Sequence, residues 1–233
     1  RVVVSARSSE PLHKLATEID GLAISCDVTE AGSISRLVEA TVDALGPPHV
    51  GVYSPGQASS KMIEELTRAD TSEEMVLHYE GALTFLQSMA KAMTGSGAIT
   101  FMSSILSGHY YPGMTAYASA KAALEQLVRY AAVEYAAKGL RVNSIRPTST
   151  RTPMVEEALA IPGLEETAIK EIPMGRIAEP REIAEAAAWL SSDRASFVTG
   201  VNLPVDGGNH LMRMPHLADM PTADDLDAAY KND

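Results

Sequence analysis

Apolar segments of two kinds alternate along the chain. Short runs rich in β-branched residues are typical of buried strands, and they predict strands at residues 2–6, 22–26, 49–54, 98–104, 141–145 and 201–205. Longer segments with apolar positions at helical spacing predict helices at residues 10–20, 31–45, 72–93, 115–138, 155–170 and 180–191. Because parallel strands need a long crossover between them, this alternation predicts an α/β protein with a doubly wound parallel sheet flanked by helices.

Residues that begin and end helices fall near the predicted boundaries. Pro180 lies in a predicted first turn, where its missing amide hydrogen is not needed, and Ser72 precedes two acidic residues as a helix cap does. Gly46, Gly95 and Gly139 follow predicted helix ends, where a residue in the left-handed conformation is favoured. These signals agree with the alternation of strands and helices.

No internal repeat or low-complexity linker interrupts the pattern, so one domain is predicted over residues 1–208. The stretch 209–233 departs from the pattern, because it is rich in Met, Asp and Pro and has weak periodicity. We interpret it as a C-terminal surface tail. The alternative is an arm that crosses onto a neighbouring subunit.

The composition narrows the possible classes of function. The 233 residues carry a net charge of −11, so no basic stripe is available to neutralise nucleic-acid phosphates. Cys26 is the only cysteine, which excludes an internal disulfide and fits a reducing cytoplasm. No run of 18 apolar residues is present, so no membrane span is predicted. These features predict an acidic cytoplasmic protein that binds neither nucleic acid nor membrane, and no metal site is predicted.

The segment SSILSGHYYPGMTAYASAK contains the residues best suited to chemistry. Tyr117 and Lys121 are four residues apart at the start of a predicted helix, so their side chains share one face. A cation beside a tyrosine lowers the pKa of the phenol from about 10 toward neutral, where the phenol can exchange protons. Ser104 ends the preceding strand, and its hydroxyl could hold a carbonyl or alkoxide oxygen at the same place. The Tyr-x-x-x-Lys spacing alone is weak evidence, because it also occurs by chance.

Several motifs in the same order resemble the short-chain dehydrogenase/reductase family over nearly the whole chain. Ser104 falls 13 residues before Tyr117, which with Lys121 lies in the run YASAKAAL, and RVNSIRPTSTRTPM and PVDGG resemble later segments of the family. The resemblance implies a Rossmann-like sheet and a hydride transfer between a nicotinamide cofactor and a carbonyl or alcohol. It also implies that Tyr117 donates or accepts the proton, that Lys121 lowers the pKa of Tyr117 and bonds the nicotinamide ribose, and that Ser104 positions the substrate oxygen.

The resemblance also assigns residues to the cofactor. They are Arg7, Asp27, Val28, Ser54, Gly56, Tyr117, Lys121, Pro147, Thr150 and Thr152. Dinucleotide enzymes that use NAD place an acidic residue at the end of the second strand, where it binds the ribose 2′-hydroxyl. The strand VVVSAR ends instead in Arg7, whose guanidinium favours a 2′-phosphate through charge-assisted hydrogen bonds. We therefore expect NADP(H) to be favoured over NAD(H).

The chain departs from the family at four places. It begins RVVVSARSS and lacks the family's first strand and TGxxxGxG turn, which carries the cofactor pyrophosphate on a helix N-terminus. We expect a fragment, because loss of that central strand leaves an unpaired edge on each flanking strand, and the alternative is a naturally shortened protein. YSPG at residues 53–56 replaces the family's NNAG, and Pro147 with Thr148 replaces its Pro-Gly. His78 replaces a catalytic Asn, and is either a catalytic residue that holds a water in the proton path or a helix histidine packed against a neighbour.

These observations predict an NADP(H)-dependent oxidoreductase that interconverts a carbonyl and an alcohol on a small, mainly apolar substrate. The missing turn and the YSPG change favour an alternative, a non-catalytic subunit or binding module on the same fold. A lyase or epimerase that reuses the tyrosine is a third possibility. Residues 153–175 occupy the family's variable substrate lid and are aliphatic, and His109, Tyr110 and Tyr111 either line the pocket mouth or lie in a surface loop. The resemblance also implies a homo-oligomer, a tetramer or a dimer.

Overall fold

The computed structural model describes residues 1–212, without the side chains of Met154 and Glu157. Its strands are all parallel and are β1 (Val3–Val4), β2 (Leu22–Ala23), β3 (Val50–Tyr53), β4 (Gly97–Met102), β5 (Leu140–Pro147) and β6 (Asn202–Val205). β1 pairs with β2, while β3, β4, β5 and β6 pair in that order in a four-stranded sheet. β1 and β2 are shorter than predicted, although hydrogen bonds between the two segments continue as far as the amide of Cys26 and the carbonyl of Ala6.

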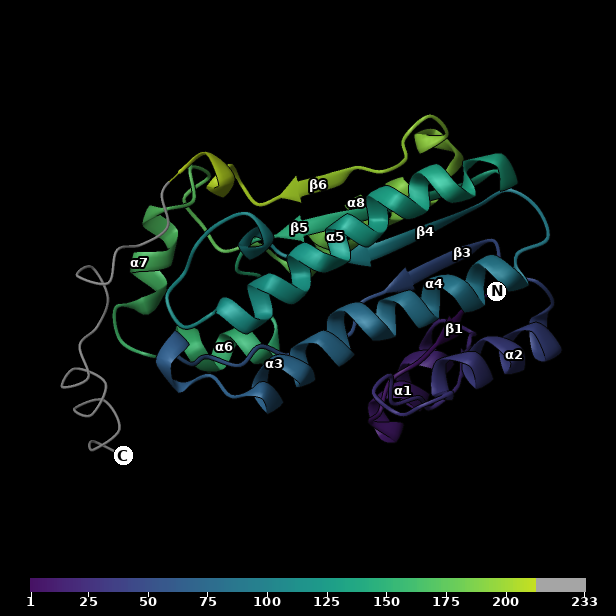
Figure 1. Cartoon of the computed structure of the whole chain (residues 1–233), viewed down its shortest axis with the longest axis horizontal. Helices are drawn as coiled ribbons and strands as arrows, with labels where there is room; N and C mark the ends of the chain where they lie inside the picture. Colours follow the sequence, from purple (N-terminus) through teal and green to yellow (C-terminus); the bar gives the residue numbers. More distant parts are fainter. Residues whose placement is uncertain (213–233) are drawn as a thin grey trace.

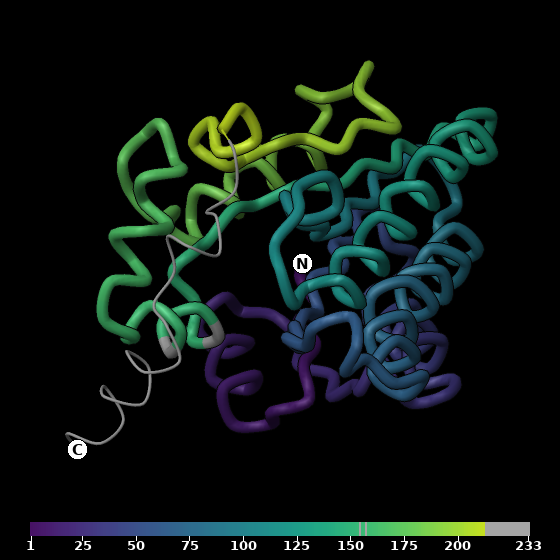
Figure 2. Tube along the Cα trace, turned by 60° about the vertical axis from the view of Figure 1, so that its left-hand side comes forward, coloured from purple at the N-terminus to yellow at the C-terminus, as the bar shows by residue number. Residues whose placement is uncertain are grey.

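The helices are α1 (Ser9–Glu18), α2 (Ser33–Leu45), α3 (Arg68–Met75), α4 (Gly81–Ala92), α5 (Thr115–Tyr135), α6 (Pro153–Leu159), α7 (Leu164–Lys170) and α8 (Pro180–Ser191). Short 3-10 helices lie at Ile63–Glu65, Ile105–Ser107, Ala136–Lys138, Asp193–Ala195 and Asn209–Leu211. In Figures 1 and 2, α2, α4 and α5 lie side by side on one face of the four-stranded sheet, and Figure 1 shows α8 behind it. This is the predicted doubly wound arrangement, with helices on both faces. Within the part of the chain that the structure describes, no helix combines the length and apolar character needed to cross a bilayer.

Each face of the sheet carries its own apolar cluster. On the α4–α5 side, Phe101 of β4 packs with Leu124 and Val128 of α5, and all three side chains are fully buried. On the other side, Ile145 of β5 packs with Leu190 of α8, and both are again fully buried. Burial of such side chains contributes about 1.5–3 kcal/mol each, so the two clusters fix the sheet between its helix layers.

The strands form two parallel sheets. β1 pairs with β2, and the chain then crosses to β3 and continues in order through β4 and β5 to β6. Because the strands of each sheet are parallel, their carboxyl ends lie at one edge of that sheet. Open α/β sheets bind ligands at this edge.

The predicted third helix differs from the structure at its start and in its middle. α3 begins at Arg68 rather than Ser72, because Thr67 and Asp70 form a capping box in which each side chain bonds the backbone amide of the other. Between α3 and α4, Val76–Glu80 form a π-helical turn. Such turns are frequent at functional sites, and this one carries His78.

The hydroxyl of Tyr53 stabilises the π-helical turn from the end of β3. It donates a hydrogen bond of 2.8 Å to the carbonyl oxygen of Leu77. The hydroxyl reaches this position because Gly81 has no side chain, and a Cβ on Gly81 would overlap it directly. The phenol therefore links the carboxyl end of β3 to the backbone of the turn.

Other predicted boundaries depend on glycine and proline. The predicted helix over 155–170 divides into α6 and α7, because Pro162 and Gly163, which has φ of +80°, interrupt it. Gly139 adopts the predicted left-handed conformation, with φ of +74°, whereas Gly46 combines φ of +84° with ψ of −177° and lies outside the left-handed helical region. Gly95 does not, because α4 ends in an extended residue, so that prediction is wrong.

Candidate active site

The carboxyl ends of β3, β4 and β5 open into one cavity of about 900 Å³. The predicted site residues on its wall are Ser54, Gly56, Ser104, Tyr117, Lys121, Pro147, Thr150 and Thr152. Much of the remaining wall is apolar and includes Ile105, Leu106, Met114, Val155 and Leu159. The structure therefore places a few polar residues at one side of a mainly apolar cavity, an arrangement common in ligand-binding sites.

Ser104, Tyr117 and Lys121 lie close together where β4 ends and α5 begins. The side chain of Ser104 hydrogen-bonds that of Tyr117, and its Oγ also accepts a bond of 3.2 Å from the amide of Leu106. The Nζ atom of Lys121 donates a bond of 2.7 Å to the carbonyl of Met102 and lies 5.6 Å from the centre of the Tyr117 ring. The predicted juxtaposition of serine, tyrosine and lysine is thus present.

Burial is the largest effect on the pKa values of Lys121 and Tyr117. Lys121 is 3% exposed, and burial lowers its pKa to about 7, although the charges of Glu74 and Glu125 act in the opposite direction. Burial also raises the pKa of Tyr117, although its hydrogen bond with Ser104 lowers it. Burial is the largest of these effects, and the lowering of the Tyr117 pKa by Lys121 stays a prediction. Tyr117 is therefore a protonated phenol near neutral pH.

A buried ion pair fixes the turn that carries Ser104. Glu125 of α5 is 2% exposed, and its Oε1 atom accepts hydrogen bonds from Ser103 Oγ at 2.7 Å and from Arg146 Nε at 2.6 Å. A second guanidinium nitrogen of Arg146 bonds Oε2. Ser107 Oγ contacts the same carboxylate and donates to the Ser104 carbonyl at 2.7 Å. The residues on both sides of Ser104 are therefore held to α5 and β5.

A buried acid–imidazole pair lies behind Tyr117. Glu74 is 1% exposed and His78 is fully buried, and His78 Nε2 lies 3.1 Å from Glu74 Oε2 and 2.9 Å from the carbonyl oxygen of Gln57. The His78 ring meets the Tyr117 ring edge-on, with 5.2 Å between ring centres. His78 thus packs against Tyr117 and is not among the residues of the cavity wall, and a catalytic role for it stays a prediction.

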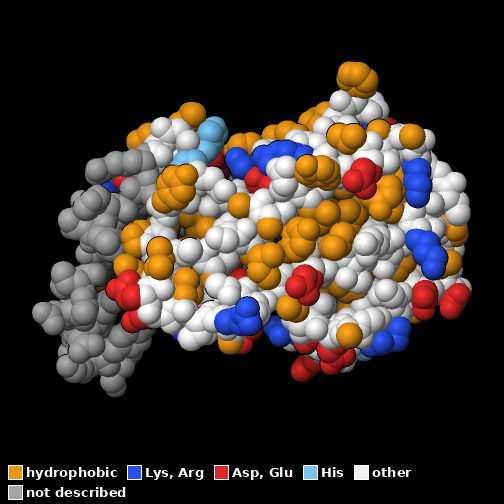
Figure 3. All heavy atoms as spheres, viewed as in Figure 1, with side chains coloured by type: hydrophobic (Ala, Val, Ile, Leu, Met, Phe, Trp, Pro, Cys, Tyr) orange, Lys and Arg blue, Asp and Glu red, His pale blue; other side chains and the backbone are white. Residues whose placement is uncertain are grey.

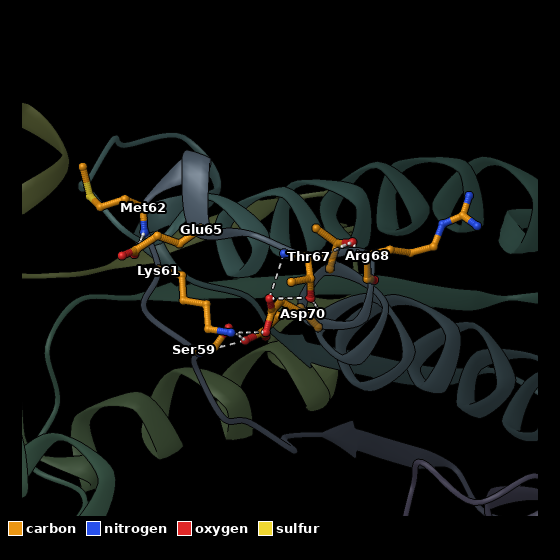
Figure 4. Close-up of polar contacts among 9 residues, drawn as sticks. Ser59, Lys61, Met62, Glu65, Thr67, Arg68 and Asp70 are labelled. Atoms are coloured by element: carbon orange, nitrogen blue, oxygen red, sulfur yellow. Dashed lines mark hydrogen bonds and ion pairs between the residues drawn. The ribbon is translucent and has the colours of Figure 1, made fainter.

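The loop after β3 is held to α3 by polar contacts. Glu74 Oε1 accepts hydrogen bonds from the amide and the hydroxyl of Ser59, at 2.8 and 2.7 Å. Lys61 bonds Asp70 at 2.7 Å, and Asp70 also bonds the amide and the hydroxyl of Thr67 (Figure 4). Hydrogen bonds from Lys61 and Thr67 lower the pKa of Asp70 to about 2, so its carboxylate stays charged. The loop that carries Ser54 and Gly56 is therefore fixed at its far end.

The three remaining predicted cofactor residues lie near the carboxyl ends of β1 and β2. Arg7 and Asp27 line a second pocket of about 490 Å³, together with Arg36. Hydrogen bonds from the side chain and the amide of Thr29 lower the pKa of the Asp27 carboxyl, whose residue is half-buried. Val28 packs against the core cluster instead and is not part of the pocket wall. The structure thus separates Arg7, Asp27 and Val28 from the large cavity.

The predicted substrate lid contains α6 and α7. Arg151 joins its parts, because it forms ion pairs with Glu165, with Glu156 at 3.4 Å and with Glu179 at 3.6 Å. Apolar residues of α6 and α7, among them Ala158 and Leu164, line the cavity. The lid therefore forms part of the apolar wall.

The loop after Ser104 and the C-terminal segment meet near the cavity. Tyr111 lines the cavity, whereas Tyr110 is 90% exposed. His109 Nε2 lies 3.1 Å from the carbonyl oxygen of His210. Asn209, the first residue of the predicted tail, is buried and lies on the cavity wall. Residues 213–233 of that tail lie outside the described residues.

Known proteins resemble this chain across most of its length. A family profile described as Enoyl-(Acyl carrier protein) reductase matches residues 1–210. The chain is 37% identical over 190 residues to cis-4-hydroxycyclohexanecarboxylate dehydrogenase of Sinomonas cyclohexanicum, covering 80% of this chain and 76% of that protein. The chain belongs to the short-chain dehydrogenase/reductase family. The expected family and fold are therefore confirmed.

Other members of the short-chain dehydrogenase/reductase family are similarly close. The chain is 37% identical over 220 residues to the A-factor type gamma-butyrolactone 1'-reductase (1S-forming) of Streptomyces virginiae, covering 89% of this chain and 84% of that one. A solved short-chain type dehydrogenase/reductase from Mycobacterium ulcerans superimposes with a TM-score of 0.89 at 28% identity, over 97% of this chain and 88% of that one. The family consists of oxidoreductases that use nicotinamide cofactors.

The sequence analysis missed the buried charges around the site. Glu74 precedes His78 by four residues and Glu125 follows Lys121 by four, spacings that put each pair on one helix face and could have pointed to them. Arg146 comes from β5, and its pairing with Glu125 depends on how the sheet packs on α5. No local pattern shows that contact.

Proposed function

We propose that this protein is an NADP(H)-dependent oxidoreductase that interconverts a carbonyl and an alcohol on a small, mainly apolar substrate. The observation that carries the proposal is the convergence of Ser104, Tyr117 and Lys121 on one side of the apolar cavity. A proton donor beside a hydrogen-bonding hydroxyl and a cation is the set of groups that carbonyl reduction requires. Membership of a family of oxidoreductases supports the same conclusion.

The side chains of this group have distinct roles in the proposed reaction. When bound, the nicotinamide group supplies or accepts the hydride. Tyr117 gives its proton to the carbonyl oxygen in reduction and takes a proton from the hydroxyl in oxidation, and its raised pKa keeps it ready to donate. Ser104 holds the same oxygen through its hydroxyl. The ammonium group of Lys121, beside the Tyr117 ring, stabilises negative charge on the phenolate.

The residues present fit the two ends of a nicotinamide dinucleotide. Arg7 and Asp27 follow β1 and β2, and their pocket offers a guanidinium and an acceptor for the adenosine end. Residues 54–56 follow β3 and residues 150–152 follow β5, so they would hold the nicotinamide end beside Lys121. Both sets lie at the carboxyl ends of parallel strands, where open α/β sheets bind ligands.

The cavity wall supports an uncharged, mainly apolar substrate. Apolar side chains from α6, α7 and the loop after β4 cover much of it, among them Leu106, Val155 and Leu159. The relatives from Sinomonas and Streptomyces are named for a cyclohexane and a lactone ring. We therefore propose ring ketones and ring alcohols as the first substrates to test.

Replacement of Tyr117 tests the proposed function. Oxidation of NADPH by the purified protein, in the presence of a panel of cyclic ketones, is followed by absorbance. We expect Tyr117→Phe to lower kcat/KM by about 10²–10⁴-fold, because the proton donor is lost. Tyr110→Phe is the matched control, since Tyr110 is 90% exposed, and it should keep full activity. Activity of Tyr117→Phe within a few-fold of the original would rule out the assigned role, and no turnover by the original protein would favour a binding module.

Replacement of Arg7 tests the choice of cofactor. If Arg7 binds the 2′-phosphate, Arg7→Ala should weaken NADPH binding by about 10–100-fold, because a charge-assisted hydrogen bond contributes about 1.5–3 kcal/mol. NADH binding should change little. Arg68→Ala is the control, because Arg68 is an exposed residue of α3 far from the pocket in sequence. Equal losses for both cofactors, or equal efficiency of the original protein with NADH, would contradict the assignment.

We also propose a homo-oligomer. Figure 3 shows apolar side chains gathered over the middle of the face that carries α4 and α5. Tyr130 and Val133 of α5 contribute to the exposed apolar surface, at 61% and 78% exposed. A monomeric mass by light scattering would contradict this proposal.

A further inference from the structure

Glu74 is a buried carboxylate to which the proposed reaction gives no role. We propose that Glu74, acting through His78, is a positioning residue of the active site: the pair clamps residues 57–59 to α3 and holds a fixed negative charge behind Tyr117 and Lys121. This inference rests on the proposed function, because it describes how that same site is arranged.

The clamp consists of three hydrogen bonds to one short segment. His78 Nε2–H donates to the carbonyl oxygen of Gln57 at 2.9 Å, and Ser59 donates twice to Glu74 Oε1, from its amide at 2.8 Å and from its hydroxyl at 2.7 Å. Ala58 lies between these two residues and lines the cavity. The pair therefore determines where this part of the wall stands.

The acceptors around His78 determine its tautomer. Nε2 faces two acceptors, the carbonyl oxygen of Gln57 and Glu74 Oε2, so Nε2 carries a proton. Nδ1 is buried and has no hydrogen-bond partner among residues 1–212, which suits an unprotonated ring nitrogen. Glu74 can therefore hold the imidazole in one orientation, with its edge against the Tyr117 ring.

The charge on Glu74 affects the pKa of both Tyr117 and Lys121. Burial raises the pKa of Glu74, but the adjacent His78 and the hydrogen bonds from Ser59 together lower it by more, so that it lies below its ordinary value and the carboxylate is ionised. That charge raises the pKa of Tyr117 and that of Lys121, although burial is the largest effect on each. Glu74 thus favours the phenol and the ammonium forms, which are the forms needed to protonate a carbonyl.

The other charged side chains near Tyr117 differ from Glu74 in their ion-pair partners. From α5, Lys121 lies over the Tyr117 ring, and Glu125 lies one turn further along the helix. From β5, Arg146 forms a close ion pair with Glu125 and neutralises it. Glu74 faces a histidine instead of an arginine, so its charge is felt more strongly by its neighbours.

The decisive experiment compares Glu74→Gln with Glu73→Gln in the purified protein. Glu73 is the exposed neighbour of Glu74 on α3, so its variant removes the same charge from the same helix without touching the clamp. The first readout is hydrogen exchange of the amides of residues 54–60, which needs no cofactor. The second is the pH dependence of kcat/KM for alcohol oxidation, which reports the phenol of the free enzyme.

Glu74→Gln should affect both readouts. Exchange at residues 54–60 should become about tenfold faster or more, because one lost hydrogen bond of about 1.4 kcal/mol changes an opening equilibrium tenfold. The midpoint of the rising limb of alcohol oxidation should move to lower pH, because the charge of Glu74 raises the pKa of Tyr117 and the variant removes that charge. Glu73→Gln should change neither quantity.

The outcomes separate this inference from the proposed function. If the original protein turns over no alcohol, the proposed function fails, while hydrogen exchange still decides the clamp. If the protein is active and Glu74→Gln behaves like Glu73→Gln, the inference is wrong and the proposed function stands. Should Glu74→Gln fail to fold, Ser59→Ala removes one bond and keeps the charge. Faster exchange at residues 54–60 with an unchanged pH midpoint would then support the clamp, and unchanged exchange would overturn it.

Discussion

The contact between Tyr53 and Gly81 allows a sharp test of how the π-helical turn is held. Gly81→Ala adds a methyl group where the Tyr53 hydroxyl lies. Alanine in a helix is favoured over glycine by about 1 kcal/mol. Against this gain, overpacking costs about 1–3 kcal/mol, and loss of the 2.8 Å bond to Leu77 leaves two buried polar groups unpaired, at about 1–3 kcal/mol. We expect Gly81→Ala to lower the free energy of unfolding by about 2–4 kcal/mol.

A second substitution should remove most of this loss. Tyr53→Phe deletes the oxygen that the new methyl group would strike and leaves the ring carbon Cζ 3.4 Å away, an ordinary contact. The single variant Tyr53→Phe should cost about 1–2 kcal/mol, because the Leu77 carbonyl loses its donor. Gly81→Ala in the Tyr53→Phe background should then cost less than about 1 kcal/mol.

Urea unfolding of the four proteins, followed by circular dichroism, measures these quantities. The double-mutant cycle should give a coupling energy of about 2 kcal/mol in favour of the double variant. Additive effects within about 0.5 kcal/mol, or a stable Gly81→Ala single variant, would show that the hydroxyl does not lie against Gly81.

Three further predictions concern charges and an exposed ring. Glu125→Ala should lower the free energy of unfolding by about 2–4 kcal/mol, because it leaves the Arg146 guanidinium without its carboxylate. The control Glu134→Ala, on the exposed face of α5, should change the free energy of unfolding by less than about 0.5 kcal/mol. Similar losses for the two variants in urea unfolding would contradict the buried ion pair. Because Lys121 has a pKa of about 7 when folded and about 10.5 when unfolded, the unfolded chain binds more protons between these values, so stability should rise from pH 7 to pH 10, by at most about 1.4 kcal/mol per unit. Lys121→Met should flatten this rise in urea midpoints, and an equal slope would refute the burial effect. Phe197→Ser should leave thermal unfolding of the monomer unchanged within about 0.5 kcal/mol, because the ring is fully exposed, and a larger change would show that the ring packs against protein.

The sequence by itself determined the class of fold and the main reactive group. Alternation of β-branched runs with helical patterns depends on local spacing, so the order of strands and helices follows from it. Tyr117 and Lys121 share a helix face because they are four residues apart, and Ser104 follows closely after the end of β4. Most other boundaries that the sequence predicted correctly also depend on local signals, such as Gly139 after α5 and Pro180 at the start of α8.

Tertiary structure decided the features that depend on contacts between distant segments. The π-helical turn exists where Tyr53 of β3 meets the helix that carries His78, and no periodicity of that helix predicts a partner from another strand. Burial is the largest cause of the raised pKa of Tyr117, and the surroundings that bury the phenol are assembled only when α5 packs on the sheet. The placement of Glu74 behind the site depends likewise on the loop after β3 folding back onto α3. Spacing along the chain identifies which residues can react, whereas packing determines the charge and the surroundings in which they do so.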